Sequence, residues 1–239
     1  WTAAVVGVLV IATLISIWRH NRHRTVVVRL AAAALAVVAL QAWIGRSVVR
    51  ADLDVDLVAL HLAVSMVVLA LLTLVAVTFS PRRDDGQVTD ADHTWTTRLG
   101  VAAGGSYALL LLGAYVHNRH FSGWPLVSNT LVPVLSDRYT LVPWLHRAVA
   151  GAGFFYLGWL VGTARRVGRP AGEQSLLRLA AGAYALNVGL GAVHVLTEVT
   201  SGAVITAHLL GSTVVWTALV AVTALSRTGV AVPSGRMEP

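Results

Sequence analysis

Histidine is the residue type in this sequence that could hold a metal or move a proton. The chain has nine histidines and no cysteine, which excludes thiolate metal sites and cysteine nucleophiles. Three of the histidines, His61, His146 and His208, stand inside strongly apolar runs. A histidine in such a run is costly in lipid unless it faces the interior of a helix bundle, where it marks a candidate functional site.

The composition is that of a membrane protein. Of the 239 residues, 56% are hydrophobic and 12% are charged, and the mean hydropathy is +0.71, whereas a soluble domain carries about 25% charged residues. The basic residues are all arginine, and the formal net charge is +7. Because the arginines lie in short clusters between apolar runs, they indicate membrane topology rather than nucleic-acid binding. A water-soluble enzyme is excluded.

Seven apolar runs are long enough to cross a bilayer as helices, which takes about 20 residues. They cover approximately 1–18, 26–48, 56–79, 97–117, 141–164, 174–196 and 202–226. The runs are continuous rather than alternating, which predicts an all-α, polytopic transmembrane helix bundle and not a β-barrel. We expect a cytoplasmic connector over 81–96 and a disordered tail over 227–239.

The arginines also predict the orientation. If the first run begins outside, most arginines fall on inner connections, and those left outside are Arg46, Arg50, Arg119, Arg138 and Arg147. The positive-inside rule then predicts a multi-pass plasma-membrane protein with an outer N-terminus and a cytoplasmic C-terminus. His61, His146 and His208 would each lie roughly 8–9 Å deep in the outer leaflet.

Three histidines at one depth favour a cofactor site over three separate packing residues. A neutral imidazole offers a basic nitrogen to a metal ion or to haem iron, and helix bundles hold haem between side chains on facing helices. Zinc or copper is an open alternative, but no carboxylate or sulfur shares this depth, which favours haem. His194, near the outer end of its run, is a weaker candidate ligand.

An internal repeat relates two helix pairs. Gln41, Gly45 and His61 in the first pair match Asn187, Gly191 and His208 in the second, with the amide 20 or 21 residues before the histidine. Extending the alignment backwards places the counterpart of His146 just upstream of Trp1. The repeat therefore predicts two pseudo-symmetric four-helix halves, with 1–80 in the N-terminal half and 97–226 forming the C-terminal half. Seven of the eight expected helices would be present here.

Other polar residues near the outer ends have two interpretations. Residues that could pair with haem carboxylates or contact lipid headgroups are Arg46, Arg119, Arg147, His117 and His120. The outer loop over about 117–139 is long enough to suggest a function. On the inner side, the histidines expected in basic or polar loops are His20, His23 and His93.

Together these residues resemble the haem A synthase family. In chain order, the resemblance is carried by Gln41 to Gly45 with His61, by Gly113-Ala114-Tyr115-Val116 with Trp124-Pro125-Leu126, by His146-Arg147, and by Asn187 to Gly191 with His208. The ordered set spans nearly the whole chain. The resemblance implies an eight-helix protein whose first helix and outer loop would lie upstream of Trp1.

The resemblance also implies an activity. It implies an integral-membrane oxidoreductase that converts the methyl group of haem O to the formyl group of haem A. His146 and His208 would hold the iron of a haem b that transfers electrons, and His61 would be a catalytic ligand on the haem O side. Expected partners are haem O, the lipid bilayer, a haem O synthase and a terminal oxidase, with no nucleic acid.

Two other functions stay open on the sequence. A non-catalytic di-histidine membrane cytochrome b would bind one haem and oxidise no methyl group. A transporter would also have helices in repeats, but these repeats are parallel rather than inverted, and no helix has a Gly or Pro break at its midplane.

Overall fold

The computed structural model describes residues 2–79, 90–117, 138–196 and 201–228, and all regular structure within them is helical. The helices are α1 Thr2–Asn21, α2 Thr25–Arg50, α3 Val55–Phe79, α4 Asp90–His117, α5 Arg138–Arg166, α6 Ala171–Leu196 and α7 Gly202–Thr228. The expected all-α bundle is confirmed within these residues. Most of the predicted outer loop and almost all of the tail lie outside the described residues.

Six of the helices in the described part of the chain are long and apolar enough to span a membrane. The helix that falls short is α5, where the sequence analysis also expected a span. It is the longest helix, with 29 residues, and it carries Pro143 in its interior and His146-Arg147 one turn later. These residues lower its hydropathy, and they line a cavity inside the bundle rather than its outer surface.

The start of α4 differs from the sequence-based boundary. The helix begins at Asp90 rather than near 97, within the segment expected to be a connector. The apolar run locates the membrane-crossing part of a helix but not the polar turns that continue it. Here Trp95 and Thr96 are buried because they contact polar groups of α6 and α7.

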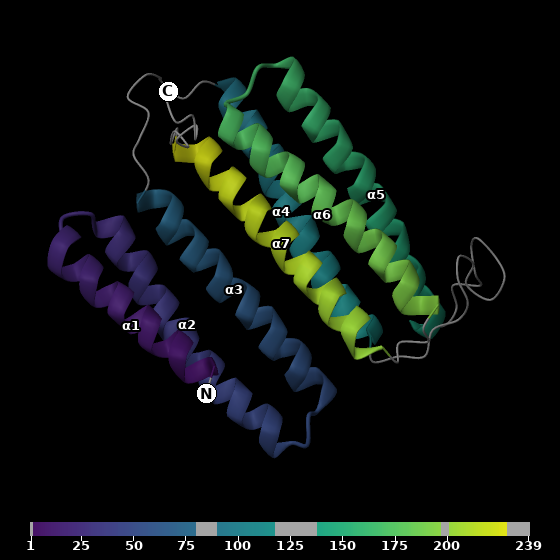
Figure 1. The fold of residues 1–239 in the computed structure, drawn as a ribbon, viewed down its shortest axis with the longest axis horizontal. Coiled ribbons are helices and arrows are strands. Elements are labelled where there is room, and N and C mark those ends of the chain that lie inside the picture. The colour runs from purple at the N-terminus through teal and green to yellow at the C-terminus, as the bar shows by residue number, and fades with distance from the viewer. Residues whose placement is uncertain (1, 80–89, 118–137, 197–200, 229–239) are drawn as a thin grey trace, which may run out of the picture.

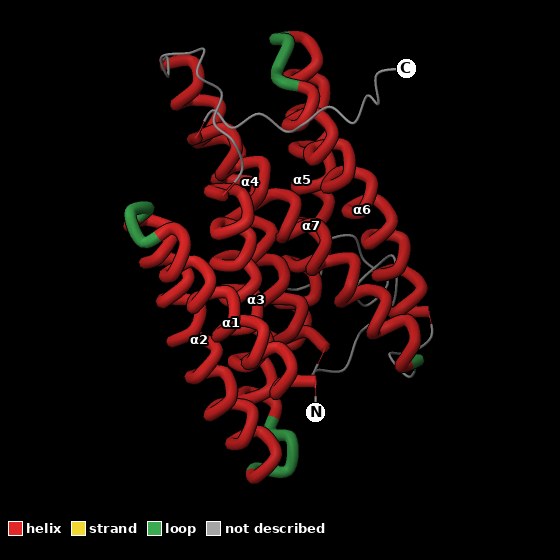
Figure 2. The backbone as a smooth tube through the Cα atoms, turned by 60° about the vertical axis from the view of Figure 1, so that its left-hand side comes forward, coloured by secondary structure: helices red, strands yellow, loops and turns green. Residues whose placement is uncertain are grey.

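The helices form two connected groups, which Figures 1 and 2 show from two sides. Helices α4 to α7 form a ring in which each packs against the next and α7 returns to α4. Helices α1, α2 and α3 form a row, and α3 joins that row to the ring through contacts with α7 and α4. The α3 helix is therefore the boundary between the two groups.

Short turns join α1 to α2, α2 to α3 and α5 to α6 as antiparallel pairs. Between α2 and α3, Asp54 caps α3 by accepting hydrogen bonds from the backbone N–H groups of Asp56 and Leu57, both at 3.1 Å. Between α5 and α6, Gly168 has a φ of +66°, a left-handed conformation that glycine adopts without strain. The helix ends consequently gather at two levels, which we call the histidine end, near His61 and His208, and the arginine-rich end, near Arg98 and Arg169.

The α4–α7 ring has a tightly packed core in its arginine-rich half. Four leucines that are at most 1% exposed meet there, one from each helix: Leu99, Leu160, Leu177 and Leu219. Alanines such as Ala164 and Ala180 lie between them and let the helix backbones approach closely. Because helices in lipid gain little from the hydrophobic effect when they associate, this close packing is the main source of their attraction.

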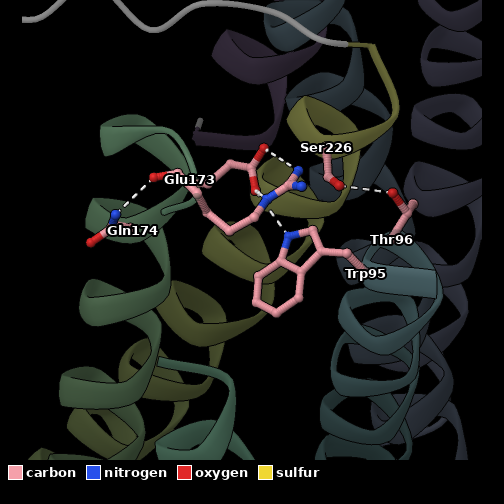
Figure 3. Close-up of polar contacts among 6 residues, drawn as sticks. Trp95, Thr96, Glu173, Gln174 and Ser226 are labelled. Carbon is pink, nitrogen blue, oxygen red and sulfur yellow. Dashed lines mark hydrogen bonds and ion pairs between the residues drawn. The ribbon is translucent and has the colours of Figure 1, made fainter. Parts of the chain in front are cut away.

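A buried polar cluster joins α4 to α6 at the arginine-rich end (Figure 3). The Glu173 carboxylate accepts a hydrogen bond of 2.9 Å from Trp95 Nε1 and forms a 3.0 Å ion pair with Arg169 Nε. The Arg169 guanidinium also lies 5.5 Å from the centre of the Trp95 ring. Nearby, the hydroxyls of Thr96 and Ser226 are hydrogen-bonded at 2.7 Å and connect α4 to α7.

Replacing Glu173 with alanine is expected to destabilise the protein. The Glu173→Ala variant leaves Arg169 and the Trp95 indole without their shared acceptor in a site where the Glu173 side chain is 7% exposed, a loss on the order of 3 kcal/mol. Thermal unfolding in detergent measures it. The control is Arg178→Ala in the same helix, because Arg178 is exposed and its guanidinium donates to the hydroxyl of the nearby Ser175. Equal unfolding temperatures for the two variants would contradict the assignment.

Candidate functional site

Each of the three candidate histidines packs against a glycine of the preceding helix. The pairs, with the distance from a Cβ built on the glycine to the histidine Cε1, are Gly45–His61 (3.1 Å), Gly113–His146 (3.0 Å) and Gly191–His208 (3.3 Å). A side chain on any of these glycines would push the ring away. The histidines follow the starts of α3, α5 and α7 by six to eight residues, so they lie about 9–12 Å from those helix ends.

A chain of hydrogen bonds holds His208 between α6 and α7. Its Nδ1 lies 3.1 Å from the backbone carbonyl oxygen of Asn187, and its own carbonyl accepts a 3.0 Å bond from the Ser212 hydroxyl. The Asn187 amide in turn donates to that hydroxyl at 2.8 Å. Because a carbonyl can only accept, Nδ1 carries the proton and the neutral ring has its lone pair on Nε2. We call this set of Asn187, His208 and Ser212 the α6/α7 brace.

The same arrangement recurs between α2 and α3. The Gln41 amide donates to the carbonyl of His61 at 2.7 Å and also to the Ser65 hydroxyl, which itself donates to the His61 carbonyl at 2.8 Å. Unlike His208, His61 has a buried Nδ1 that makes no hydrogen bond with any residue that the structure describes. The same is true of Gln41 Oε1. We call Gln41, His61 and Ser65 the α2/α3 brace.

The third pair, between α4 and α5, keeps the glycine and the histidine but not the polar brace. Leu109 stands four residues before Gly113, where the other pairs have an amide, and Ala150 stands four residues after His146, where they have a serine. The His146 ring faces the backbone of Leu109, yet its buried Nδ1 makes no hydrogen bond of ordinary geometry. The carbonyl of Ala150 instead accepts a 2.9 Å bond from the Tyr184 hydroxyl.

A cavity of about 540 Å³ occupies the histidine half of the α4–α7 ring. It receives His146 from α5 and His208 from α7, which stand diagonally in the ring, so the two imidazoles approach it from opposite helices. The residues of α3 that close one side are Val58, Ala59 and Leu62. The volume lies within the range of about 300–1,000 Å³ typical of small-molecule and cofactor sites.

Arg147 gives the cavity a positive group. Its Nη1 and Nη2 atoms are both buried, and neither has a hydrogen-bond partner in the structure as described. A guanidinium binds carboxylates and phosphates through paired N–H donors, so these two buried groups suit an anionic ligand. Arg46, the other arginine considered as a carboxylate contact, is exposed on α2 and does not line this cavity.

His194 also lies at the cavity. Its ring is nearly parallel to that of His208, with an interplanar angle of 8° and centroids 6.0 Å apart. In the described ranges, no group of three or more histidine or carboxylate side chains has the spacing of a metal-ion site. His146 of α5 and His208 of α7 line the same cavity from two helices that do not follow each other in the ring.

His61 does not line this cavity. It faces Gly45 of α2, on the other side of α3 from the ring. Tyr107 and Trp216 hold α3 at this boundary, because the Tyr107 hydroxyl donates to the carbonyl of Ala63 at 3.2 Å and the Trp216 indole donates to that of Met66 at 2.8 Å. Their rings contact each other with centroids 5.1 Å apart. The structure therefore places the candidate histidines on two sides of one helix.

The remaining candidates are less informative. The histidines His20, His23 and His93 are exposed at the arginine-rich end, His20 and His93 inside helices rather than loops. The side chain of His117 and all of Arg119 and His120 lie outside the described residues, as does the Trp124-Pro125-Leu126 motif.

The sequence analysis did not predict the roles of five residues at the site. Gly113, Ser65 and Ser212 had a local signal, namely a glycine at a fixed depth and a serine four residues after the histidine in both copies of the repeat. The pair of Tyr107 and Trp216 had none, because the backbone groups that they contact are 44 and 150 residues away along the chain.

The chain was compared with known protein families, with curated proteins and with solved structures. The family model described as COX15-CtaA, cytochrome oxidase assembly protein, matches residues 1–220. No curated protein and no solved structure matches the chain.

Adding a methyl group at Gly113 is expected to disturb the site. In Gly113→Ala the new Cβ would stand 3.0 Å from His146 Cε1, an overpacked contact that costs about 1–3 kcal/mol. Gly104→Ala is the matched control in α4, because nothing lies within 4 Å of its Cβ and alanine favours the helix by up to about 1 kcal/mol. Thermal unfolding should rank Gly104→Ala at or above the unsubstituted protein and Gly113→Ala below it. The reverse order would refute the contact.

Proposed function

Because the chain belongs to the COX15-CtaA family of cytochrome oxidase assembly proteins, we propose that it is a haem A synthase. This integral-membrane oxidoreductase oxidises a methyl group of haem O to the formyl group of haem A. The observation that carries the proposal is that His146 and His208 enter one cavity from diagonally placed helices. A pair of imidazoles on opposite sides of an apolar cavity suits a di-histidine haem b.

The residues at the cavity fit a haem. The Nδ1–H of His208 is directed to the Asn187 carbonyl, which leaves Nε2 as the basic nitrogen that an iron ligand needs. The volume of about 540 Å³ and the largely apolar walls suit a flat aromatic macrocycle. The buried Arg147 guanidinium supplies two N–H donors for a haem carboxylate. When bound, the haem would supply a one-electron carrier inside the bundle.

The protein's own residues would hold and shield that group. His146 and His208 would bind the iron, and the α6/α7 brace would keep the His208 ring at a fixed depth and rotation. The walls from α3 and α4 would exclude water, which lowers the local dielectric and strengthens the Arg147 contact. The Tyr184 hydroxyl satisfies the carbonyl of Ala150 on the turn that follows His146.

Haem O is the proposed substrate, and its site would lie on the α2 side of α3. His61 is the candidate catalytic ligand there, since its Nδ1 is buried without a partner and the α2/α3 brace holds its backbone. The cavity residues Val58, Ala59 and Leu62 and the ligand His61 share the same two turns of α3. This proximity suits electron transfer between the two haem sites.

The setting of the protein is part of the proposal. Six apolar spans support a multi-pass membrane protein, and the arginine distribution favours a plasma-membrane orientation with the histidine end outside and the C-terminus in the cytoplasm. Haem O is itself lipophilic, so a haem O synthase that delivers it and a terminal oxidase that accepts haem A are the proposed partners.

A second candidate function is a non-catalytic di-histidine cytochrome b. The observation that favours it is that the cavity of the α4–α7 ring contains His146 and His208 but not His61. Such a protein would bind one haem and carry electrons, with His61 a packing residue.

Haem analysis distinguishes the two candidates. The purified protein should give a b-type reduced-minus-oxidised spectrum, and chromatography of the extracted haems should show haem b together with haem O or haem A. Haem b alone would favour the cytochrome, and a preparation without haem would contradict both.

Histidine variants test the residue roles. His146→Ala and His208→Ala should abolish the b-type absorption, because each removes a ligand of the iron. His61→Ala should keep that absorption and stop haem A formation from haem O, since His61 lies outside the cavity. A normal spectrum in His208→Ala would show that the ligand assignment is wrong. The exposed His20, replaced by alanine, is the control and should change neither readout.

A further inference from the structure

The two histidines at the cavity are held with unequal strength. His208 is fixed at both its ring and its backbone, because the ring Nδ1 bonds to the Asn187 carbonyl and the His208 carbonyl bonds to Ser212. The Asn187 amide closes the loop at 2.8 Å from the Ser212 hydroxyl. Moving His208 toward or away from the cavity would break hydrogen bonds on both α6 and α7.

A ring contact adds to the hold on His208. His194 lies nearly parallel to it, at 8° between ring planes and 6.0 Å between centroids. His194 belongs to α6, as Asn187 does, so the neighbouring helix contacts His208 through its backbone, an amide and an imidazole.

His146 has none of these side-chain contacts. The equivalent positions are the apolar Leu109 and Ala150. The His146 ring faces the Leu109 backbone, but within the described residues its Nδ1 makes no hydrogen bond of ordinary geometry. Pro143, one turn earlier inside α5, cannot donate the hydrogen bond of its helical position. The turn of α5 that carries His146 is therefore less constrained than the turn of α7 that carries His208.

From this difference we propose that His208 stays bound to the iron of the haem, whereas His146 is the ligand that dissociates when a small molecule binds. The inference rests on the proposed haem b site. It adds that a small neutral ligand of ferrous iron would bind on the α5 side of the cavity. With carbon monoxide as the probe, its carbon would take the place of the His146 imidazole as a ligand of the ferrous iron, and the iron would keep its oxidation state.

The C–O stretching frequency reports which side the probe occupies. His146→Gly and His208→Gly, each loaded with haem in the presence of imidazole to fill the missing ligand position, give reference frequencies for carbon monoxide on the α5 side and on the α7 side. We expect the unsubstituted protein to show one band that matches the His146→Gly reference.

Serine variants test the physical reason. Ser212→Ala removes the hydroxyl that connects Asn187 to the His208 carbonyl. Either histidine could then dissociate from the iron, and a second band should appear at the α7-side frequency. Ser212→Thr keeps a hydroxyl and should retain the single band. Ser65→Ala removes the matching hydroxyl of the α2/α3 brace, outside the cavity, and should also leave one band. This series decides the question even where a glycine variant loses its haem, because it compares proteins that keep both ligands.

Three outcomes would overturn the inference alone: a single band at the α7-side frequency in the unsubstituted protein, no reaction of its ferrous haem with carbon monoxide, or an unchanged single band in Ser212→Ala. An unsubstituted protein that contains no haem would instead overturn the proposed function, and the inference with it.

Discussion

The contact between a histidine ring and a glycine of the preceding helix is the constraint on which this structure depends. It occurs at Gly45, Gly113 and Gly191, and in each case the missing side chain is what lets the two helices close on the imidazole. In a bilayer, where hydrophobic attraction between helices is weak, such close approach is both the source of helix association and the means of aiming a polar side chain inward. Helix packing and site geometry are thus set by the same atoms.

In the α4–α7 ring, close helix packing and the polar site occupy different halves of the helices. Its arginine-rich half is filled by leucines and alanines and joined by the cluster around Glu173, whereas its histidine half encloses the cavity. A site that must hold buried polar groups at fixed positions needs rigid elements behind it. The packed half supplies that rigidity, so the hollow half can keep a buried arginine and two imidazoles without collapsing.

Much of this could be predicted from the sequence, for identifiable reasons. Apolar runs located the helices because lipid demands about 20 such residues, and the repeat located His61 and His208 because the amide and glycine recur at matching positions. The hydrogen bond from His208 to the Asn187 carbonyl could not be predicted, because every residue has a backbone carbonyl and the sequence does not show which one accepts. The polar first turns of α4 were missed because the partners of Trp95 and Thr96 are on α6 and α7. The contact of Gly113 with His146 was missed because neither copy of the polar brace accompanies it.

The sequence repeat assigns α3 to the N-terminal half, but α3 contacts α2 of that half and also α4 and α7 of the other. Val58, Ala59 and Leu62 close the cavity of the other half, and Tyr107 and Trp216 reach across to its backbone. Residues 97–226, taken alone, would form a bundle with one wall of its cavity missing. Because α3 closes this cavity and also carries His61 against Gly45, a substitution in α3 can affect the contacts on both of its sides.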